Sequence, residues 1–251
     1  MNVRVFRTAD EAAHAAASAV AAQLARKRAS VLGLPTGRTS LEVYEELARL
    51  HEAGEADFSL AHTFNVDEFV GLASNDERSY CAFMQQHLFS RINLPGSQVH
   101  FLDGATGNHA QECARFERDI ATLGGLDLLL LGLGGNAHVG FNEPGRSLQP
   151  RTHLARLALE TRRANAELFG GLLSTVPREA LTMGMGTMLE ARAIVLIATG
   201  PSKARAVASM FTGRISTGQP ASLLQLHSNV EVILDLAAAE KLPESGFDAK
   251  P

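Results

Sequence analysis

The segment LDLLLLGLGGNAHVGFNEP, residues 126–144, decides the fold that we expect of this chain. Its leucines are interrupted only by Asp127 and Gly132, and polar residues do not alternate with them. The apolar run is too short for an ordinary helix and is typical of a parallel strand that is buried on both faces. Glycines at 132, 134 and 135 then let the backbone approach a ligand closely. Because ligands bind at the carboxyl ends of strands in open α/β sheets, the segment predicts a central strand that leads into a binding loop.

Two titratable side chains follow these glycines. His138 can change its charge near neutral pH, and Glu143 lies five residues further on. The carboxylate could orient the imidazole or relay its proton. A single histidine is more often structural than catalytic, but the glycine-rich loop before it and the Asn142 to Pro144 sequence after it favour a site.

The composition limits the possible classes of protein. At 251 residues, with 45% hydrophobic and 20% charged residues, the chain fits one large α/β domain better than two small ones. The formal net charge of -4 and the scattered arginines argue against a nucleic-acid partner, which needs a basic patch. Residues 1–11 carry no apolar signal segment, and no run reaches the roughly 18 apolar residues of a membrane span. We therefore expect a cytoplasmic protein with no membrane partner.

The two cysteines do not indicate a disulfide or a metal site. Cys81 and Cys113 lie in segments with helical patterns, and neither has paired spacing or nearby histidines. We expect both to be small buried hydrophobic residues, and we predict no metal site.

Strand and helix patterns alternate along the rest of the chain. Strands are expected at residues 3–6, 30–34, 63–66, 99–102, 126–133, 193–198 and 230–234, with an extended segment at 154–159. Helices are expected near residues 8–28, 41–50, 79–89 and 111–123, and after Pro177. Thr8 and Glu11 have the spacing of a capping box at the start of the first helix. The alternation predicts a single α/β domain over residues 1–251, with a doubly wound, mainly parallel open sheet, helices on both faces and a frayed tail at 241–251.

The loop after the second strand has the composition of an anion site. Its polar residues are Thr36, Gly37, Arg38, Thr39 and Ser40, and a helix follows directly. Hydroxyl and backbone N–H groups could hold a phosphate at the positive end of that helix. The Gly-Lys-Ser/Thr ending of a P-loop is missing, and taken alone the segment fits a capped turn equally well.

Two further loops carry charged candidates. Asp67 and Glu68 follow the third strand, where one carboxylate could serve as a base, although a solvated pair is the ordinary interpretation. Lys203 opens a helix, where the helix dipole disfavours a cation unless it binds an anion. That position favours a ligand role for this lysine.

These loops jointly resemble the glucosamine-6-phosphate deaminase family, also called glucosamine-6-phosphate isomerase. The resemblance runs from about Ser30 to Asp235. It is carried in order by the segments LGLPTGRTS, FNVDEFVGL, LGLGGNAHVGFNEP, ALTMGMGTMLEA, TGPSKA and SLLQLH. The related 6-phosphogluconolactonases lack the continuation of the histidine loop into FNEP.

The resemblance implies that D-glucosamine 6-phosphate and water are converted to D-fructose 6-phosphate and ammonia without a cofactor. Asp67 matches the carboxylate that moves a proton at C2 of the sugar. His138 matches the imidazole that assists ring opening, with Glu143 as its partner and Asn136 beside it. We expect Arg38, Lys203 and the loop from Thr36 to Ser40 to bind the phosphate of the substrate. Members of the family often form symmetric homo-oligomers.

Three positions depart from the family pattern. Asn136 replaces an aspartate, and Ala137 replaces a glycine. Glu167 stands where many members have a phosphate-binding arginine, and a carboxylate there would repel a phosphate. Arg38, where a glycine is commoner, either supplies the missing cation or neutralises Glu167.

Two alternatives to the glucosamine 6-phosphate activity stay open at this point. The first is a deaminase/isomerase of a related sugar phosphate, such as galactosamine 6-phosphate. The second is a sugar-phosphate-binding module without catalysis on the same fold. Asp67, His138 and Glu143 favour an enzyme, since a binding module has no need of this set.

Overall fold

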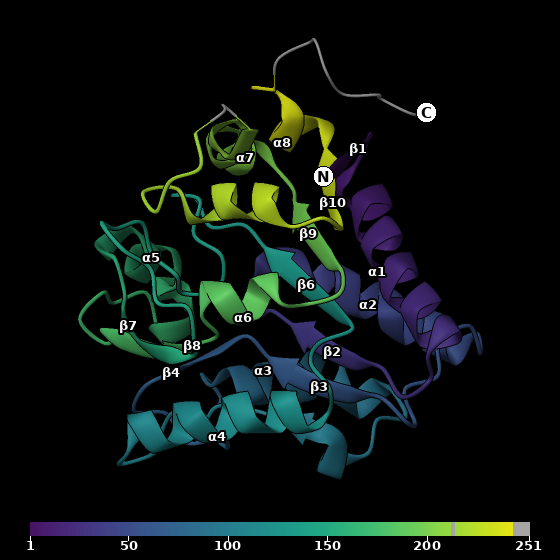
Figure 1. The fold of residues 1–251 in the computed structure, drawn as a ribbon, viewed down its shortest axis with the longest axis horizontal. Coiled ribbons are helices and arrows are strands. Elements are labelled where there is room, and N and C mark those ends of the chain that lie inside the picture. Colours follow the sequence, from purple (N-terminus) through teal and green to yellow (C-terminus); the bar gives the residue numbers. More distant parts are fainter. Residues whose placement is uncertain (212–213, 243–251) are drawn as a thin grey trace.

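A parallel sheet of seven strands organises the computed structural model, which describes residues 1–211 and 214–242 (Figure 1). In spatial order the strands are β1 (Asn2–Phe6), β10 (Val230–Asp235), β9 (Ile194–Ala198), β6 (Leu128–Gly132), β2 (Val31–Leu34), β3 (His62–Asn65) and β5 (Val99–His100). Every pairing within this sheet is parallel. The predicted doubly wound α/β fold is therefore confirmed. The predicted frayed tail lies outside the described residues from position 243 onward.

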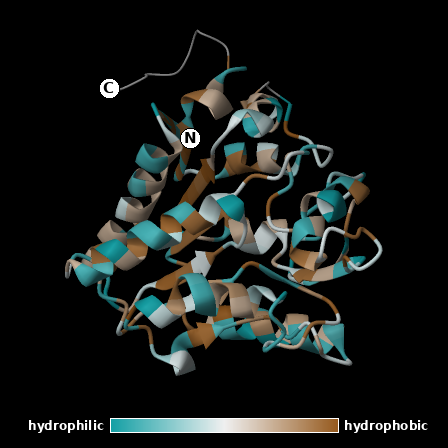
Figure 2. Cartoon of the chain, turned by 180° about the vertical axis from the view of Figure 1, so that it is seen from behind, coloured by the Kyte–Doolittle hydropathy of each residue, from teal (hydrophilic) through white to brown (hydrophobic). Residues whose placement is uncertain are grey.

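Helices cover both faces of the sheet. One face is covered by α1 (Ala9–Arg26), α2 (Arg38–Glu52) and α3 (Tyr80–His87). The other is covered by α4 (His109–Thr122), α6 (Met185–Leu189), α7 (Ala204–Phe211) and α8 (Leu236–Ala239). Shorter helical segments are η1 (Phe89–Arg91), η2 (Gly96–Gln98), α5 (Leu159–Ala164), η3 (Ala166–Phe169), η4 (Pro201–Lys203) and η5 (Pro220–Leu226). Seen from behind, the strands between the helical layers are largely hydrophobic (Figure 2).

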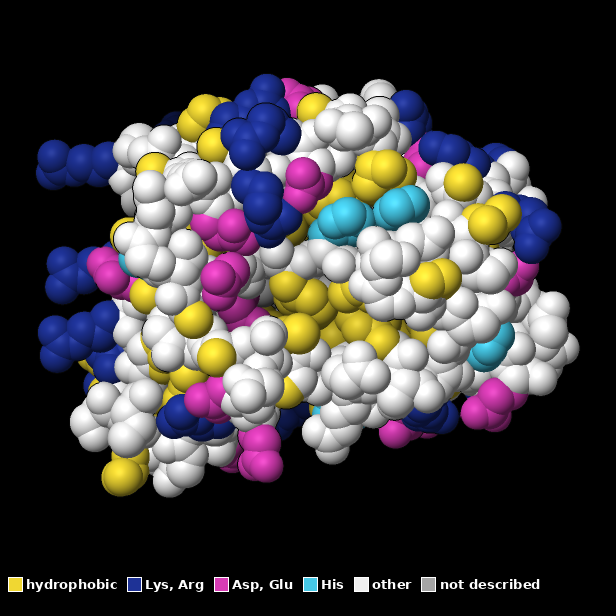
Figure 3. Space-filling view, turned by 90° about the horizontal axis from the view of Figure 1, so that it is seen from below, with side chains coloured by type: hydrophobic (Ala, Val, Ile, Leu, Met, Phe, Trp, Pro, Cys, Tyr) yellow, Lys and Arg dark blue, Asp and Glu magenta, His cyan; other side chains and the backbone are white. Residues whose placement is uncertain are grey.

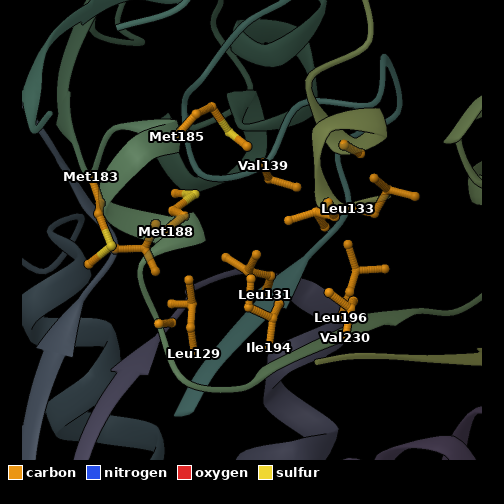
Figure 4. Close-up of a cluster of buried hydrophobic side chains, with 14 of the residues drawn as sticks. Leu129, Leu131, Leu133, Val139, Met183, Met185, Met188, Ile194, Leu196 and Val230 are labelled. Atoms are coloured by element: carbon orange, nitrogen blue, oxygen red, sulfur yellow. The ribbon is translucent and has the colours of Figure 1, made fainter. Parts of the chain in front are cut away.

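The central strand β6 is buried on both faces, as its unbroken leucine run predicts. Leu128 and Leu130 join the hydrophobic cluster beneath α1 and α2. Leu129 and Leu131 point the other way, into the cluster that contains Met188 of α6 (Figure 4). A strand with two helical layers has no polar face, so the sequence shows no alternation.

The first helix begins where the sequence predicts. The hydroxyl of Thr8 accepts a hydrogen bond from the backbone N–H of Glu11 at 3.1 Å. The carboxylate of Glu11 accepts the backbone N–H of Arg7 at 2.8 Å, one residue before the position expected in a capping box. The alanine-rich side of the helix is buried against β9 and β10, which explains its composition.

A second, antiparallel sheet was not predicted from the sequence. It contains β4 (Asp67–Phe69), β8 (Glu179–Thr182) and β7 (His153–Arg156). The predicted helix after Pro177 is wrong at its start, because residues 179–182 form β8 and the helix α6 begins only at Met185. The strand forms because it pairs with β4 on one side and β7 on the other, more than 20 residues away in each case, and local periodicity does not report such partners.

The cysteines and the surface agree with the composition. Cys81 and Cys113 are free thiols on α3 and α4, with Cys113 buried and Cys81 half-buried. Acidic and basic side chains are interspersed around a hydrophobic hollow on the face seen from below (Figure 3). Among the helices of the described residues, none is long and apolar enough to cross a membrane.

Asp127 joins the amino ends of three strands of the main sheet. Its buried carboxylate accepts hydrogen bonds from Lys27 Nζ at 2.7 Å, the Val31 backbone N–H at 2.8 Å and Arg192 Nη1 at 2.6 Å. Burial raises the pKa of this carboxyl, but these donors and the two cations outweigh it, so the pKa lies below its ordinary value. The carboxylate is therefore ionised and stabilises the fold at neutral pH.

We expect Asp127→Ala to lower the free energy of unfolding by about 3 kcal/mol, because it leaves a buried N–H without a partner and two cations without an anion. The wild-type advantage should fade as the pH falls through the depressed pKa of Asp127. Urea denaturation at pH 7 and pH 3 measures both effects. Glu231→Ala removes the exposed ion pair with Arg4 and should cost less than about 1 kcal/mol. Equal losses in the two variants would contradict a special role for Asp127.

Candidate active site

The candidate site lies where the chain leaves β2 and β6 toward opposite faces of the sheet. After β2 the chain enters α2, which packs on the face of Leu34 and Leu130. After β6 the chain runs along the other face, where Leu133 and Val139 join the cluster of Leu131 (Figure 4). Such a change of direction between neighbouring strands is the switch point at which open α/β sheets bind ligands.

The turn after β6 fixes the position of the His138 ring. The Ala137 N–H donates to the Gly134 carbonyl at 3.0 Å, and the Gly134 N–H donates to the His138 carbonyl at 2.9 Å. The imidazole lies directly over Gly134, where a Cβ atom would come within 2.3 Å of Nε2. Ala137 has a positive φ of 67°, which a glycine adopts without strain and which fits the glycine expected there from the sequence resemblance. Gly134 therefore makes room for the His138 ring, while the predicted close approach of the backbone to a ligand stays a prediction.

His138, Asn136 and Glu143 form one polar group. Nδ1 of His138 lies 3.5 Å from Oε2 of Glu143, and the Asn136 amide donates to the same oxygen at 2.9 Å. Oε1 of Glu143 accepts the Ala158 backbone N–H at 3.0 Å, and the Thr161 hydroxyl lies 3.4 Å from Nδ1. Because Nδ1 faces a carboxylate and a hydroxyl, Nε2 is the nitrogen left to act on a ligand.

The surroundings of Glu143 keep it ionised. Burial raises the pKa of this carboxyl, but His138, Thr161 and Asn136 outweigh the burial and bring the pKa to about 2. A carboxylate that stays charged at neutral pH can accept the Nδ1–H of the imidazole and so hold the orientation of the ring. Asn136 takes part through its amide N–H, which donates to Glu143 as a neutral group.

Thr182 of β8 ties the histidine loop to Asp67. It is the cross-strand partner of Asp67, and its hydroxyl accepts the Phe141 backbone N–H at 3.0 Å. Asn142 reinforces this link, since its buried amide donates to the carbonyls of Val139 and Met183. The predicted pair of sites, one after β3 and one after β6, is therefore held together by a strand that the sequence did not reveal.

Asp67 is a buried carboxyl whose side chain forms no hydrogen bond with any of the described residues. Burial raises its pKa well above the ordinary value, and the charge of Glu68 adds to the effect. Burial raises the pKa values of the Tyr44 and Tyr80 phenols, and the Asp67 charge contributes to both shifts. A carboxyl with a raised pKa and free oxygens suits proton transfer near neutral pH.

Glu68 has a structural role, in contrast to its neighbour. Its carboxylate accepts the backbone N–H groups of Phe69, Tyr80 and Cys81 at 2.8 to 3.0 Å. It thereby joins β4 to the start of α3. Burial raises its pKa to about 7, and the three donors oppose that rise. The solvated pair considered from the sequence is wrong, because both carboxyls are buried, and only Asp67 keeps free oxygens.

The loop at the start of α2 offers unpaired donors for an anion. Gly37 precedes the helix with a φ of 136°, and no side chain caps the helix. The first turn of α2 carries no acidic residue, so its N–H groups and dipole face no anion of their own. Ser40 donates its hydroxyl to the Gly37 carbonyl at 2.7 Å and so shapes the loop. Of the remaining loop residues, Thr36 lies between β2 and α2, and Thr39 lies in the first turn of α2.

Lys203 lies close to this loop. Burial lowers the pKa of its ammonium, and the positive charge of Arg38 lowers it further, which places the two cations near each other. Within residues 1–211 and 214–242, no hydrogen bond or ion pair occupies the Lys203 side chain. Two neighbouring cations without a full complement of anions favour a dianionic ligand.

Arg38 and Glu167 meet in the structure. Nη2 of Arg38 lies 3.0 Å from Oε2 of Glu167, and the two side chains are 87% and 85% exposed. Of the two roles considered for Arg38, the structure shows the ion pair that neutralises Glu167. An ion pair so open to solvent contributes about 0–1 kcal/mol, so a stronger anion can displace the carboxylate.

Several residues of the site carried no signal in the sequence. Thr161 and Ala158 reach His138 and Glu143 from the segment around α5, and Thr182 reaches Phe141 from β8. Each contact spans between 15 and 41 positions in the chain and depends on the unpredicted sheet. In the described part of the chain, no group of three or more His, Cys, Asp or Glu side chains is arranged to hold a metal ion.

Comparisons with known proteins agree with this geometry. The family model described as glucosamine-6-phosphate isomerases/6-phosphogluconolactonase matches residues 6–233. The glucosamine-6-phosphate deaminase of Geobacillus sp. is 43% identical over 235 residues, which cover 94% of this chain and 93% of that protein. The deaminase of Bacillus velezensis is 45% identical over 240 residues, which cover 95% and 99%.

Solved structures give the same result. A monomeric glucosamine-6-phosphate deaminase has a TM-score of 0.93 and 40% identity, over 96% of this chain and 100% of that chain. A 6-phosphogluconolactonase from Trypanosoma brucei has a TM-score of 0.74 at 19% identity, over 96% and 98%, and shares the fold. On the matched sequence, the sheet topology and the arrangement of the loops, the chain belongs to the glucosamine-6-phosphate isomerase and 6-phosphogluconolactonase family.

Proposed function

We propose that this protein converts D-glucosamine 6-phosphate and water to D-fructose 6-phosphate and ammonia. The observation that carries the proposal is that the site combines a carboxyl with a lowered pKa and a carboxyl with a raised pKa. One is Glu143, which is ionised beside His138, and the other is Asp67, which has free oxygens. Groups whose surroundings separate their pKa values in this way can divide acid and base roles between them. The names of the deaminase relatives support the same activity.

The proposed chemistry has two proton transfers. His138, with Glu143 behind Nδ1, moves a proton at the ring oxygen and opens the sugar. Asp67 then takes the proton from C2 and returns it at C1, which turns the amine carbon into an imine. Water adds at C2 and ammonia leaves, so the net reaction consumes one water. Residues 36–40 and Lys203 are proposed to bind the phosphate, with Arg38 after its release from Glu167.

An assay for fructose 6-phosphate and ammonia tests this function directly. Formation of product from glucosamine 6-phosphate supports the proposed function. Formation of product only from galactosamine 6-phosphate would show that the substrate is the epimer. Binding of glucosamine 6-phosphate without product would favour a sugar-phosphate-binding module that is not an enzyme.

The predicted homo-oligomer and the predicted cytoplasmic location stay predictions. Size-exclusion chromatography with light scattering decides between an oligomer and a monomer like the solved relative.

For Asp67→Asn we expect turnover to fall about 100-fold or more, the scale of a lost general base, while the fold is kept. The melting temperature should hold or rise at neutral pH, because the amide avoids the cost of a buried charge. In the wild type, turnover should fall as the pH drops through the raised pKa of Asp67, well above the ordinary range of a carboxyl. Steady-state kinetics from pH 4 to 9 checks both statements. Solvent deuterium entering C1 at the wild-type rate in the variant would remove Asp67 from this role.

Gly134→Ala should displace the His138 ring, because the new Cβ would lie within 2.4 Å of three ring atoms. We expect turnover to fall about tenfold or more, the lower range of a misplaced acid or base, with little change in the Michaelis constant. Gly132→Ala is the matched control, because a Cβ at that position meets no atom within 4 Å. The same kinetic loss in both alanine variants would contradict a positioning role for the turn.

The exposed pair of Arg38 and Glu167 predicts opposite effects of two substitutions. Arg38→Ala should raise the Michaelis constant for glucosamine 6-phosphate by about tenfold or more, the value of a hydrogen bond to a charged group. Glu167→Ala should lower it by several-fold, since a repelling carboxylate is removed and Arg38 is freed. Unphosphorylated glucosamine should show neither change. If Arg38→Ala weakens both substrates equally, Arg38 supports the loop and does not bind phosphate.

A further inference from the structure

Asn65 is the last residue of β3, and it is 1% exposed. Neither its amide nitrogen nor its amide oxygen has a hydrogen-bond partner among the described residues. A carboxamide offers two donors and two acceptor lone pairs, and burying it unpaired destabilises the fold relative to an apolar residue. An asparagine at this position therefore does not stabilise the fold, which suggests that it has another role.

The strand directs Asn65 toward the side of Asp67. Phe64 and Val66 both belong to the hydrophobic cluster that includes Leu131, so they point to one face of the sheet. Val66 is a bend between β3 and β4. Within β3 the side chains alternate, so Asn65 points away from Phe64, to the opposite face of the sheet, which α2 covers. The charge of Asp67 acts on Tyr44 of α2, and Tyr44 packs on that same opposite face.

The backbone between the two residues is fixed. The Val66 N–H donates to the Leu34 carbonyl at 3.0 Å, and the Val66 carbonyl accepts the Met183 N–H at 2.8 Å. Val66 is thus held by strand β2 on one side and by the residue after β8 on the other. Since the peptide cannot slide, Asn65 can adjust only by rotating its side chain.

We propose that Asn65 is a positioning residue for the reaction, and that its amide N–H donates to the ionised carboxylate of Asp67. This inference rests on the proposed role of Asp67 and adds a residue to it. A donor on one carboxylate oxygen leaves the other oxygen free to move the proton between C2 and C1. It also stabilises the charged form of the base, against the burial and the negative charge of Glu68 that oppose it.

Two further groups face this part of the site. Burial raises the pKa of the Tyr80 phenol; the charges of Asp67 and Glu68 raise it further, and the nearby Thr36 hydroxyl lowers it. Tyr44 donates its hydroxyl to the Pro35 carbonyl, so its proton is already engaged. Among the polar side chains on β3 itself, Thr63 lies on the same face as Asn65, one pleat further from Asp67. Its buried hydroxyl also lacks a partner, which makes Thr63 a matched control.

The test compares Asn65→Leu with Thr63→Val. Both remove a buried unpaired polar group at nearly constant volume, so both should keep or raise the melting temperature. Only Asn65→Leu should lower turnover, by about ten- to 100-fold, which corresponds to a lost hydrogen bond to a charged group. Its Michaelis constant should stay within about twofold of the wild type, and the acid limb of its pH profile should move to higher pH. Thr63→Val should keep wild-type kinetics.

Several outcomes would overturn the proposal. These are wild-type turnover and pH profile in Asn65→Leu, an equal loss in Thr63→Val, or a raised Michaelis constant with unchanged turnover, which would make Asn65 a substrate ligand. If Asn65→Leu does not fold, Asn65→Ser removes the amide with a small polar side chain and gives the same comparison. Carbon-13 NMR titration of the Asp67 carboxyl is independent of the reaction. A higher pKa in the Asn65 variant supports the contact even if the wild type proves inactive on glucosamine 6-phosphate, and an unchanged pKa rejects it.

Discussion

The burial of β6 between two helical layers is the constraint on which the rest of the structure depends. Leu128 and Leu130 fill one side and Leu129 and Leu131 the other, so the strand cannot shift by one residue without exchanging its faces. Asp127 satisfies two cations and a backbone N–H at the amino end. The glycine turn begins at the carboxyl end. The position of His138 is therefore set by packing that starts ten residues earlier.

Local surroundings give three glutamate and aspartate residues of the site three different properties. Glu143 lies beside His138, accepts two amide N–H groups and has a pKa of about 2. Glu68 accepts three backbone N–H groups and has a pKa of about 7. Asp67 has no donor among the described side chains, and burial raises its pKa well above the usual range. Because the chemistry of the side chains is the same, the hydrogen-bond donors decide which carboxyl braces a histidine, which holds a strand to a helix and which can act as a base.

The proposed phosphate side of the site carries an exposed pair of opposite charges. Its members are Glu167 and Arg38, at positions where the sequence resemblance leads to the expectation of an arginine and a glycine. The structure joins them at 3.0 Å on the surface, close to the half-buried Lys203. The two side chains neutralise each other in this ion pair, and Lys203 and the uncapped start of α2 have no anionic partner among the described residues.

Local patterns in the sequence were enough to predict the parallel α/β sheet, the first helix with its cap at Thr8, and the loops that carry Asp67, His138, Glu143 and Lys203. These features follow from apolar runs, capping residues and glycines, whose effects act within a few positions of the chain. Contacts between distant segments were needed to show that residues 179–182 form a strand and that Glu68 is structural while Asp67 keeps free oxygens. Such contacts also decided that Thr161 and Thr182 complete the site and that Arg38 meets Glu167, 129 positions away. The reason is that strand pairing, burial and charge contacts arise between segments far apart in the chain, and no local pattern encodes which segments will meet.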